Sequence, residues 1–238
     1  MNKKDAGSLM WPQLTQGILV KRYKRFLADV TLANGKTVTA HCPNTGSMTK
    51  CSEPGRTVYL SVHDNPKRKL KYTWELIQMP ESLVGVNTMV PNRLVKKSIE
   101  SGLIEELRGY REIFSEINVG NSRLDLLLTK EKTDRCYIEI KNCTLVENFT
   151  AFFPDAVTSR GRKHFKELQH LVKKGNRCVM FYLIQRMDAS RFKPADQIDP
   201  QYGVTLRNAV KNHVEILVYD VIISLKSISI GKKIPFIL

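Results

Sequence analysis

Residues 124–141, LDLLLTKEKTDRCYIEIK, carry the pattern that decides the fold of this chain. Two strand-like runs, Leu124–Leu128 and Cys136–Lys141, flank a polar connection. This pattern predicts the two strands of a hairpin. Alternate residues of a strand share a face, so Glu139 and Lys141 lie together while the isoleucines beside them face the core. An acidic residue and a lysine are thereby placed on one side of a strand, next to a second strand that carries an aspartate.

That aspartate, Asp125, stands among four leucines, where an uncompensated carboxylate is costly to bury. A divalent cation held by Asp125 and Glu139 would offset the charge, and Lys141 beside it would orient or activate a water. Glu116, on the preceding strand, is a candidate third carboxylate or a partner for Arg123. We therefore predict Asp125, Glu139 and Lys141 as catalytic residues and Asp125, Glu139 and Glu116 as ligands of Mg²⁺ or Mn²⁺, with no organic cofactor. The alternative is a salt-bridged ladder of surface side chains.

The elements around this hairpin predict a mixed α/β domain. A helix is expected to begin at Pro91 and to end near Gly102. Three strands follow it, at 113–118, 124–128 and 136–141. The rest of the domain is a helix at 159–174, a strand at 178–184, a helix at 201–212 and a strand at 214–219. An acidic-x-Lys on a strand, paired with an Asp on the neighbouring strand and followed by a basic helix, is the order of the PD-(D/E)xK, or restriction-endonuclease-like, core. The later Pro154-Asp155 is out of order for that motif.

The basic helix supplies candidate phosphate ligands. Helical spacing places Arg160, Lys163 and His164 near one another, where they could hold the scissile phosphate. The alternative is a solvated helix face that contacts nothing.

Residues 14–79 read as short strands separated by turns. Asn34-Gly35 lies between strand-like runs at 30–32 and 37–40, as in a tight hairpin. Further runs follow at 56–63 and 72–78, and five short strands in this length fit a small barrel of the oligonucleotide-binding (OB) type. The expected division is an N-terminal tail at 1–13, an OB-fold-like barrel at 14–82 and a nuclease-like domain at 83–238.

The charge of the chain favours nucleic acid as its partner. Lys and Arg number 38 against 23 Asp and Glu, a formal net charge of +15. Two clusters in the barrel segment combine basic and aromatic side chains, and their predicted DNA-binding residues are Lys21, Arg22, Lys24, Arg25, Lys67, Arg68 and Lys69, interleaved with Tyr23, Phe26, Tyr72 and Trp74. Alternatively, the aromatic rings point into the barrel and the charges only solvate its surface.

Several classes of protein are disfavoured. No apolar run approaches the roughly 18 residues of a membrane-spanning helix, and the N-terminus lacks a secretory signal, so we expect a cytoplasmic protein with no membrane partner. The 5 cysteines form no close pair, which indicates free thiols. Zinc bound by His41, Cys42 and Cys51 is not favoured, because these are three ligands without a tight pair.

The sequence resembles the sugar fermentation stimulation protein A (SfsA) family of bacteria from about Gln16 to Ile234. The specific stretches are KRYKRFLADV at 21–30, HCPNTG at 41–46 with Met48, YIEIK at 137–141 with Thr144 and Leu145, and FPDAVT at 153–158 with Arg160, Gly161, Lys163 and His164. The resemblance implies an OB-type barrel joined to a PD-(D/E)xK nuclease-like domain, with non-specific DNA binding and a regulatory part in sugar, especially maltose, metabolism. It also implies Asp125, Glu139 and Lys141 as the metal-site positions. Leu124 departs from the nuclease motif, which has proline there.

Two functions from different classes follow. The first is a largely non-sequence-specific protein that binds duplex and single-stranded DNA and carries a metal-dependent phosphodiesterase site, which would make it an Mg²⁺- or Mn²⁺-dependent deoxyribonuclease. The second is a non-enzymatic DNA-binding regulator of sugar (maltose) metabolism genes that keeps the nuclease fold for its shape and charge. A third class, an RNA-binding barrel protein, would place the same aromatic residues on single-stranded RNA.

Overall fold

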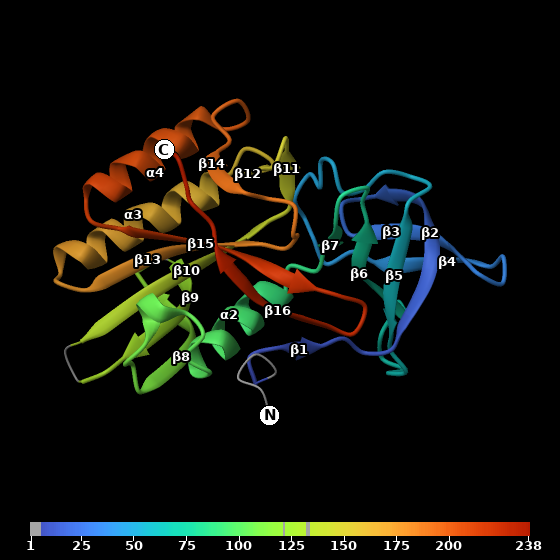
Figure 1. Ribbon diagram of the computed structural model, residues 1–238, viewed down its shortest axis with the longest axis horizontal. Helices are drawn as coiled ribbons and strands as arrows, with labels where there is room; N and C mark the ends of the chain where they lie inside the picture. Colours follow the sequence, from blue (N-terminus) through green and yellow to red (C-terminus); the bar gives the residue numbers. More distant parts are fainter. Residues whose placement is uncertain (1–5, 121, 132–133) are drawn as a thin grey trace.

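The computed structural model describes residues 6–120, 122–131 and 134–238, and the first five residues of the expected N-terminal tail lie outside this range. Two β-structures stand side by side, a barrel formed by the first third of the chain and a larger domain in which helices cover a sheet (Figure 1). No helix in the described ranges is long and apolar enough to cross a membrane.

The barrel strands are β2 (Leu14–Tyr23), β3 (Leu27–Leu32), β4 (Thr37–His41), β5 (Thr57–Val62) and β6 (Tyr72–Gln78). They are paired in the order β4-β3-β2-β5-β6, and a parallel pairing of β4 with β6 closes the ring. Among the described residues this gives a closed five-stranded barrel of the OB type, as expected. Gly35, with φ at +81°, forms the turn between β3 and β4, so the predicted hairpin is confirmed.

Burial separates the aromatic residues of the barrel. Trp74 is 0% exposed and lies in the barrel core with Leu19 and Leu60. The expectation that Trp74 offers its ring to a base is therefore wrong, because alternation along β6 turns this side chain inward. Phe26, by contrast, is 48% exposed at the turn between β2 and β3.

The larger domain contains a mixed sheet with the order β1-β16-β15-β13-β10-β9-β8. Its strands are β1 (Leu9–Met10), β8 (Glu112–Val119), β9 (Ser122–Thr129), β10 (Arg135–Cys143), β13 (Arg177–Ile184), β15 (Glu215–Ile223) and β16 (Ser227–Lys233). The central strands β10, β13 and β15 run parallel, and β9 pairs antiparallel with β10. This is the nuclease-like α/β arrangement predicted from residues 124–141.

Helices cover both faces of this sheet. The helices α3 (Ser159–Lys173) and α4 (Pro200–Lys211) lie on one face, and α2 (Val90–Glu100) lies on the other (Figure 1). Alternation along β13 divides the core accordingly, since Met180 and Tyr182 pack with α3 and α4 while Val179 and Phe181 pack with α2. The predicted helices and central strands are confirmed, including the end of α2 before Gly102.

Some strands had no sequence prediction. β1 lies in the expected tail and pairs with β16, and β7 (Leu83–Gly85), past the expected barrel boundary, pairs with β6. A small sheet of β11 (Leu145–Glu147), β12 (Thr150–Phe153) and β14 (Arg191–Pro194) also forms. Strands of two to four residues are too short to show an alternating pattern, so only their tertiary partners define them.

Candidate active site between the two domains

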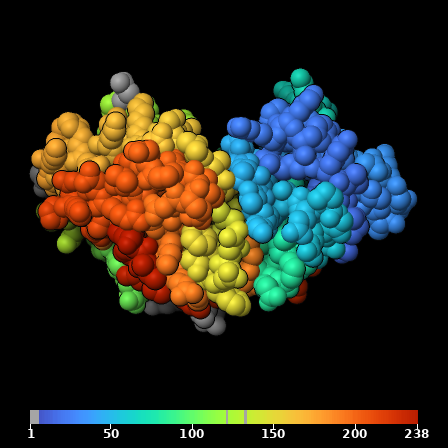
Figure 2. Space-filling view, turned by 90° about the horizontal axis from the view of Figure 1, so that it is seen from above, coloured from blue at the N-terminus to red at the C-terminus, as the bar shows by residue number. Residues whose placement is uncertain are grey.

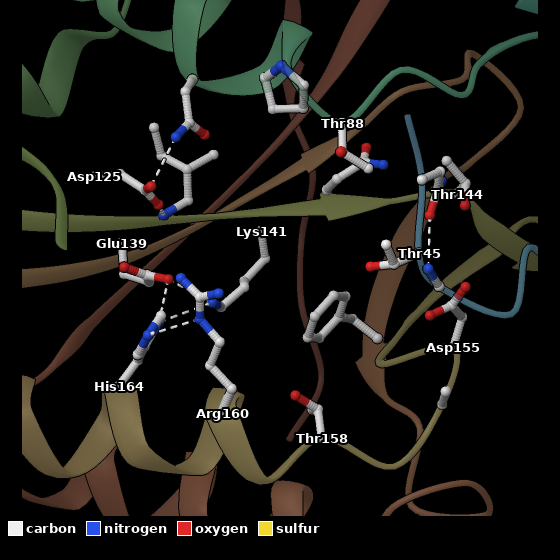
Figure 3. Close-up of a pocket in the computed structure, with 18 of the residues that line it drawn as sticks. Thr45, Thr88, Asp125, Glu139, Lys141, Thr144, Asp155, Thr158, Arg160 and His164 are labelled. Atoms are coloured by element: carbon white, nitrogen blue, oxygen red, sulfur yellow. Dashed lines mark hydrogen bonds and ion pairs between the residues drawn. The ribbon is translucent and has the colours of Figure 1, made fainter. Parts of the chain in front are cut away.

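A cavity of about 460 Å³ lies where the barrel meets the nuclease-like domain. Figure 2 shows the barrel in blue and cyan against the yellow-to-red domain, with a hollow where they meet. The barrel side contributes Arg25, Asn44, Thr45 and Gly46, and the nuclease-like side contributes, among others, Asn92, Asp125, Glu139, Lys141, Asp155, Thr158, Arg160 and His164. Figure 3 shows the labelled side chains converging on this space.

Asp125 lies where the pairing of β9 with β10 ends, after the pair Leu126 and Ile138. Its Oδ2 accepts a hydrogen bond from the Ile140 backbone N–H at 2.7 Å, and its Oδ1 accepts one from Asn92 Nδ2 at 2.7 Å. Burial, reinforced by the negative charge of Glu139, raises the pKa of Asp125 to about 6. The carboxylate is held in place, yet its charge is poorly compensated.

Glu139 is 3% exposed and projects from β10 toward α3. Its Oε1 accepts hydrogen bonds from Lys141 Nζ at 2.5 Å and from His164 Nδ1. Burial opposes ionisation, but the His164 hydrogen bond and the Lys141 charge outweigh it, so the pKa of Glu139 lies below its ordinary value. Its Oε2 is buried without a hydrogen-bond partner among the described residues. A charged, buried carboxylate thus has one oxygen without a partner in the part of the chain that the structure describes, and such atoms are rare in folded proteins.

His164 and Arg160 come from the first turns of α3, which begins after the N-cap Thr158. The His164 Nε2 accepts a long hydrogen bond from Arg160 Nε at 3.5 Å, so with Nδ1 on Glu139 both ring nitrogens are engaged. His164 therefore positions Glu139 and also lines the cavity, and its contact with a phosphate stays a prediction. Arg160 does line the cavity, whereas Lys163 is exposed on α3 outside the lining.

Glu116 does not join the two carboxylates. Its backbone adopts a left-handed φ of 59°, and its side chain forms an exposed ion pair with Arg123 at 3.0 Å. The sequence analysis gave two alternatives for Glu116, a metal ligand or a partner for Arg123. The structure contains the ion pair with Arg123.

The donor set fits some divalent cations better than others. The described residues contain no group of three or more His, Cys, Asp and Glu side chains placed to hold a metal. Two carboxylates, one with a buried unpartnered oxygen, remain in a cavity that has room for water. Mg²⁺ is typically held by one or two carboxylates and keeps several waters, and Mn²⁺ takes similar oxygen ligands. The donor types therefore suit Mg²⁺ or Mn²⁺, and Asp125 and Glu139 are the side chains that could hold the ion.

The barrel wall of the cavity is a loop, residues 43–48, held by Arg22. The Arg22 guanidinium donates to the backbone carbonyls of Asn44 and Gly46 at 2.8 and 2.9 Å and to that of Ser47 at 3.2 Å. These bonds occupy the side chain that the sequence assigned to DNA. Arg22 shapes the cavity wall instead.

Asp155 docks this loop onto the nuclease-like domain. Its Oδ2 accepts a hydrogen bond from the Met48 backbone N–H at 2.9 Å, and its carbonyl accepts one from Ser47 Oγ at 2.5 Å. A Cβ atom at Gly46 would lie 2.7 Å from Asp155 Oδ2, so any larger residue there would push the Asp155 carboxylate out of this position. Asp155 thus joins the two domains and does not stand with Asp125 and Glu139 as a third ligand.

The other predicted DNA-binding residues divide between surface and cavity. Lys21 pairs with Asp29 at 3.8 Å, and Arg68 donates to Thr73 Oγ1 at 3.0 Å. Lys24, Lys67 and Lys69 are exposed outside the cavity, and Arg25 lines it.

Sequence reasoning missed two contributors to the site. Asn92 was read only as part of a helix start, although an amide near Pro91 signals a polar N-terminus. Thr45 belongs to a stretch, HCPNTG, whose Pro-Asn-Thr-Gly composition predicts a loop but not what the loop touches.

Comparison with known proteins gives consistent matches along the chain. A family model described as the SfsA N-terminal OB domain matches residues 20–86, and one described as the sugar fermentation stimulation protein RE domain matches residues 89–227. A sugar fermentation stimulation protein homolog from Geobacter sulfurreducens is 52% identical over 223 residues, covering 93% of this chain and 95% of the relative. One from Shewanella frigidimarina is 48% identical over 216 residues, covering 90% and 92%.

A solved structure has the same fold over nearly the whole chain. It is that of Pyrococcus furiosus SfsA in complex with Ca²⁺, with a TM-score of 0.89 and 27% sequence identity. The match covers 97% of this chain and 98% of the other.

Proposed function

The chain belongs to the sugar fermentation stimulation protein family, and from that premise we propose that it binds DNA with little sequence preference and hydrolyses phosphodiesters at Asp125 and Glu139. One observation carries the proposal. Glu139 is buried and charged, and its Oε2 is unpartnered in a cavity that also contains Asp125, whose own charge is poorly compensated. A bound cation would stabilise the negative charge of two carboxylates that lie this close together.

Mg²⁺ or Mn²⁺ is the cation that we propose. The Pyrococcus furiosus relative binds Ca²⁺, another divalent ion that takes oxygen ligands. A bound divalent cation supplies positive charge that stabilises the transition state at phosphate and acidifies water.

The protein side chains have separate roles in this proposal. Asp125 and Glu139 hold the cation, while Asn92 and His164 fix the orientation of each carboxylate. Lys141, between Glu139 and His164, lies where it can orient the attacking water. Arg160, at the cavity wall, neutralises a phosphate oxygen.

The DNA-binding part of the proposal follows from charge. A net charge of +15 with exposed Lys24, Lys67 and Lys69 attracts duplex and single-stranded phosphate backbones. With DNA as its partner, the protein would act in the cytoplasm.

A second candidate is a DNA-binding regulator of sugar metabolism genes without catalysis. One contact favours it, because the Lys141 ammonium lies 2.5 Å from Glu139 and already neutralises that carboxylate without a metal. Leu124, in place of the proline of the nuclease motif, points the same way.

Calorimetric titration with Mn²⁺ and a plasmid-nicking assay separate these functions. Asp125→Asn removes one ligand and should abolish Mn²⁺ binding and nicking, whereas Asp134→Asn, at an exposed aspartate, should alter neither. Equal Mn²⁺ binding by wild type and Asp125→Asn would refute the metal site. Mn²⁺ binding that Asp125→Asn abolishes, without nicking by the wild type, would favour the regulator.

A further inference from the structure

The turn between β2 and β3 has an unusual backbone. Lys24 and Arg25 follow one another with φ at 48° and 64°, and the Phe26 N–H bonds to the Lys24 carbonyl at 2.8 Å. This left-handed conformation favours glycine and asparagine, so two basic residues in succession are strained. Strain of this kind persists where the surrounding structure holds it and is frequent at functional sites.

The turn brings Arg25 to the cavity that contains Asp125 and Glu139, in the other domain. Two further cations line that cavity, and both are engaged, Lys141 with Glu139 at 2.5 Å and Arg160 with His164 at 3.5 Å. For Arg25, the described part of the chain provides no hydrogen bond or ion pair.

The position of Arg25 relative to the carboxylates is set by contacts on both sides of the cavity. Arg22, three residues earlier, grips the carbonyls of loop 43–48, and Asp155 bonds that loop through Ser47 and Met48. The barrel therefore cannot turn away from the nuclease-like domain without breaking these bonds. A strand that enters the cavity meets the barrel on one side and the carboxylates on the other.

We propose that Arg25 is a phosphate-binding residue of this cavity, supplied by the barrel, and that the DNA strand passes between the two domains. The inference rests on the proposed function and deepens it. A guanidinium stays charged at all working pH values and can donate two parallel hydrogen bonds to one phosphate, which lysine cannot do. Arg25 thus fixes the strand opposite Asp125 and Glu139.

The first test compares DNA affinity by fluorescence anisotropy, without metal, for Arg25→Ala, Arg25→Lys and Lys24→Ala. Lys24 is the matched control because it removes one charge from the same turn outside the cavity. We expect Arg25→Ala to lose about tenfold in DNA affinity and to reduce the slope of log affinity against log salt concentration by about 1. Arg25→Lys should recover only part of the lost affinity. Lys24→Ala should lose less affinity than Arg25→Ala. Equal losses for Arg25→Ala and Lys24→Ala would overturn the inference and leave the proposed function standing. Wild type without salt-dependent DNA binding would overturn both.

The second test locates the contact in the cavity. Thymidine 3′,5′-bisphosphate carries two phosphates on one nucleoside and is small enough for a pocket rather than a long surface. Titrated calorimetrically in the presence of Ca²⁺, it should bind Arg25→Ala more weakly than Lys24→Ala by about fivefold or more, in line with a lost charge-assisted contact. Similar binding by both variants, or none by a wild type that does bind DNA, would show that Arg25 does not hold a phosphate in the cavity and would overturn the inference.

Discussion

At the scale of single residues, Glu139 is a buried carboxylate whose neighbours bond to one of its two oxygens. His164 and Lys141 both approach Oε1 and leave Oε2 without a partner among the described residues. Arg160, on the far nitrogen of His164, keeps the ring oriented. If Glu139 holds a cation as proposed, these hydrogen bonds set the direction and basicity of the ligand.

Removing this support should weaken metal binding without removing a ligand. We expect His164→Ala to lower Mn²⁺ affinity by about 10- to 100-fold in a calorimetric titration, the usual cost of losing an outer-shell partner. His164→Asn, which keeps a donor near Glu139, should recover part of the loss. His170→Ala, at an exposed histidine of the same helix, is the control. Unchanged affinity in His164→Ala would show that Lys141 alone orients Glu139.

At the scale of elements, loop 43–48 explains how a barrel residue can shape a site in another domain. Arg22 leaves the end of β2 and donates to the carbonyls of three loop residues, Asn44, Gly46 and Ser47. Asn44 Nδ2 adds a bond to the Val86 carbonyl at 3.1 Å, where the chain crosses to the other domain. The loop is thus held by side-chain hydrogen bonds rather than by a strand pairing.

Replacing Arg22 should therefore reduce the stability of the fold more than replacing Lys21, although the two residues are adjacent and carry the same charge. Arg22→Ala should lower the free energy of unfolding by about 1–3 kcal/mol, because it leaves the partly buried carbonyls of Asn44 and Gly46 without their donor. Lys21→Ala should change it by no more than about 0.5 kcal/mol, since its ion pair with Asp29 is exposed. Urea denaturation measures both. Equal stability losses would contradict a structural role for Arg22.

At the scale of the whole molecule, the two domains share a core. Leu76 of β6 and Leu83 of β7 belong to the same buried cluster as Leu94 of α2 and Phe181 of β13. The Gly85 backbone N–H also bonds to the Gln185 carbonyl at 2.8 Å. Packing that continues from barrel to sheet favours one cooperative unit.

Barrel and nuclease-like domain should therefore unfold together. In a Trp11→Phe background, fluorescence of Trp74 reports the barrel, and circular dichroism reports the helices α2, α3 and α4 of the other domain. The two urea transitions should coincide, and Leu76→Ala should shift both by about 2–5 kcal/mol. Leu225→Ala, at an exposed leucine, should leave both in place. Separate transitions would show that the shared core does not couple the domains.

The sequence alone determined the features that depend on short-range periodicity. Alternation along 136–141 puts Glu139 and Lys141 on one face, and a hairpin of known direction brings Asp125 near them, because pairing of adjacent strands leaves little freedom. The turn at Asn34-Gly35, the helices and the central strands follow from equally local signals. The sequence therefore predicted that Asp125, Glu139 and Lys141 lie close together before any tertiary contact was known.

Only the tertiary structure decided which other side chains meet Asp125, Glu139 and Lys141 in the cavity. Arg22 and Arg25 are three residues apart in one basic cluster, yet one holds a loop and the other lines the cavity. Asp155 is out of order for the nuclease motif and His164 reads as a phosphate contact in sequence, but docking of the barrel engages Asp155, and packing of α3 on β10 engages His164. Local pattern fixes the face of a strand or helix on which a side chain stands. Which partner meets it depends on contacts between segments 25 residues apart, as for His164 and Glu139, or 107 apart, as for Met48 and Asp155, and no local period encodes these contacts.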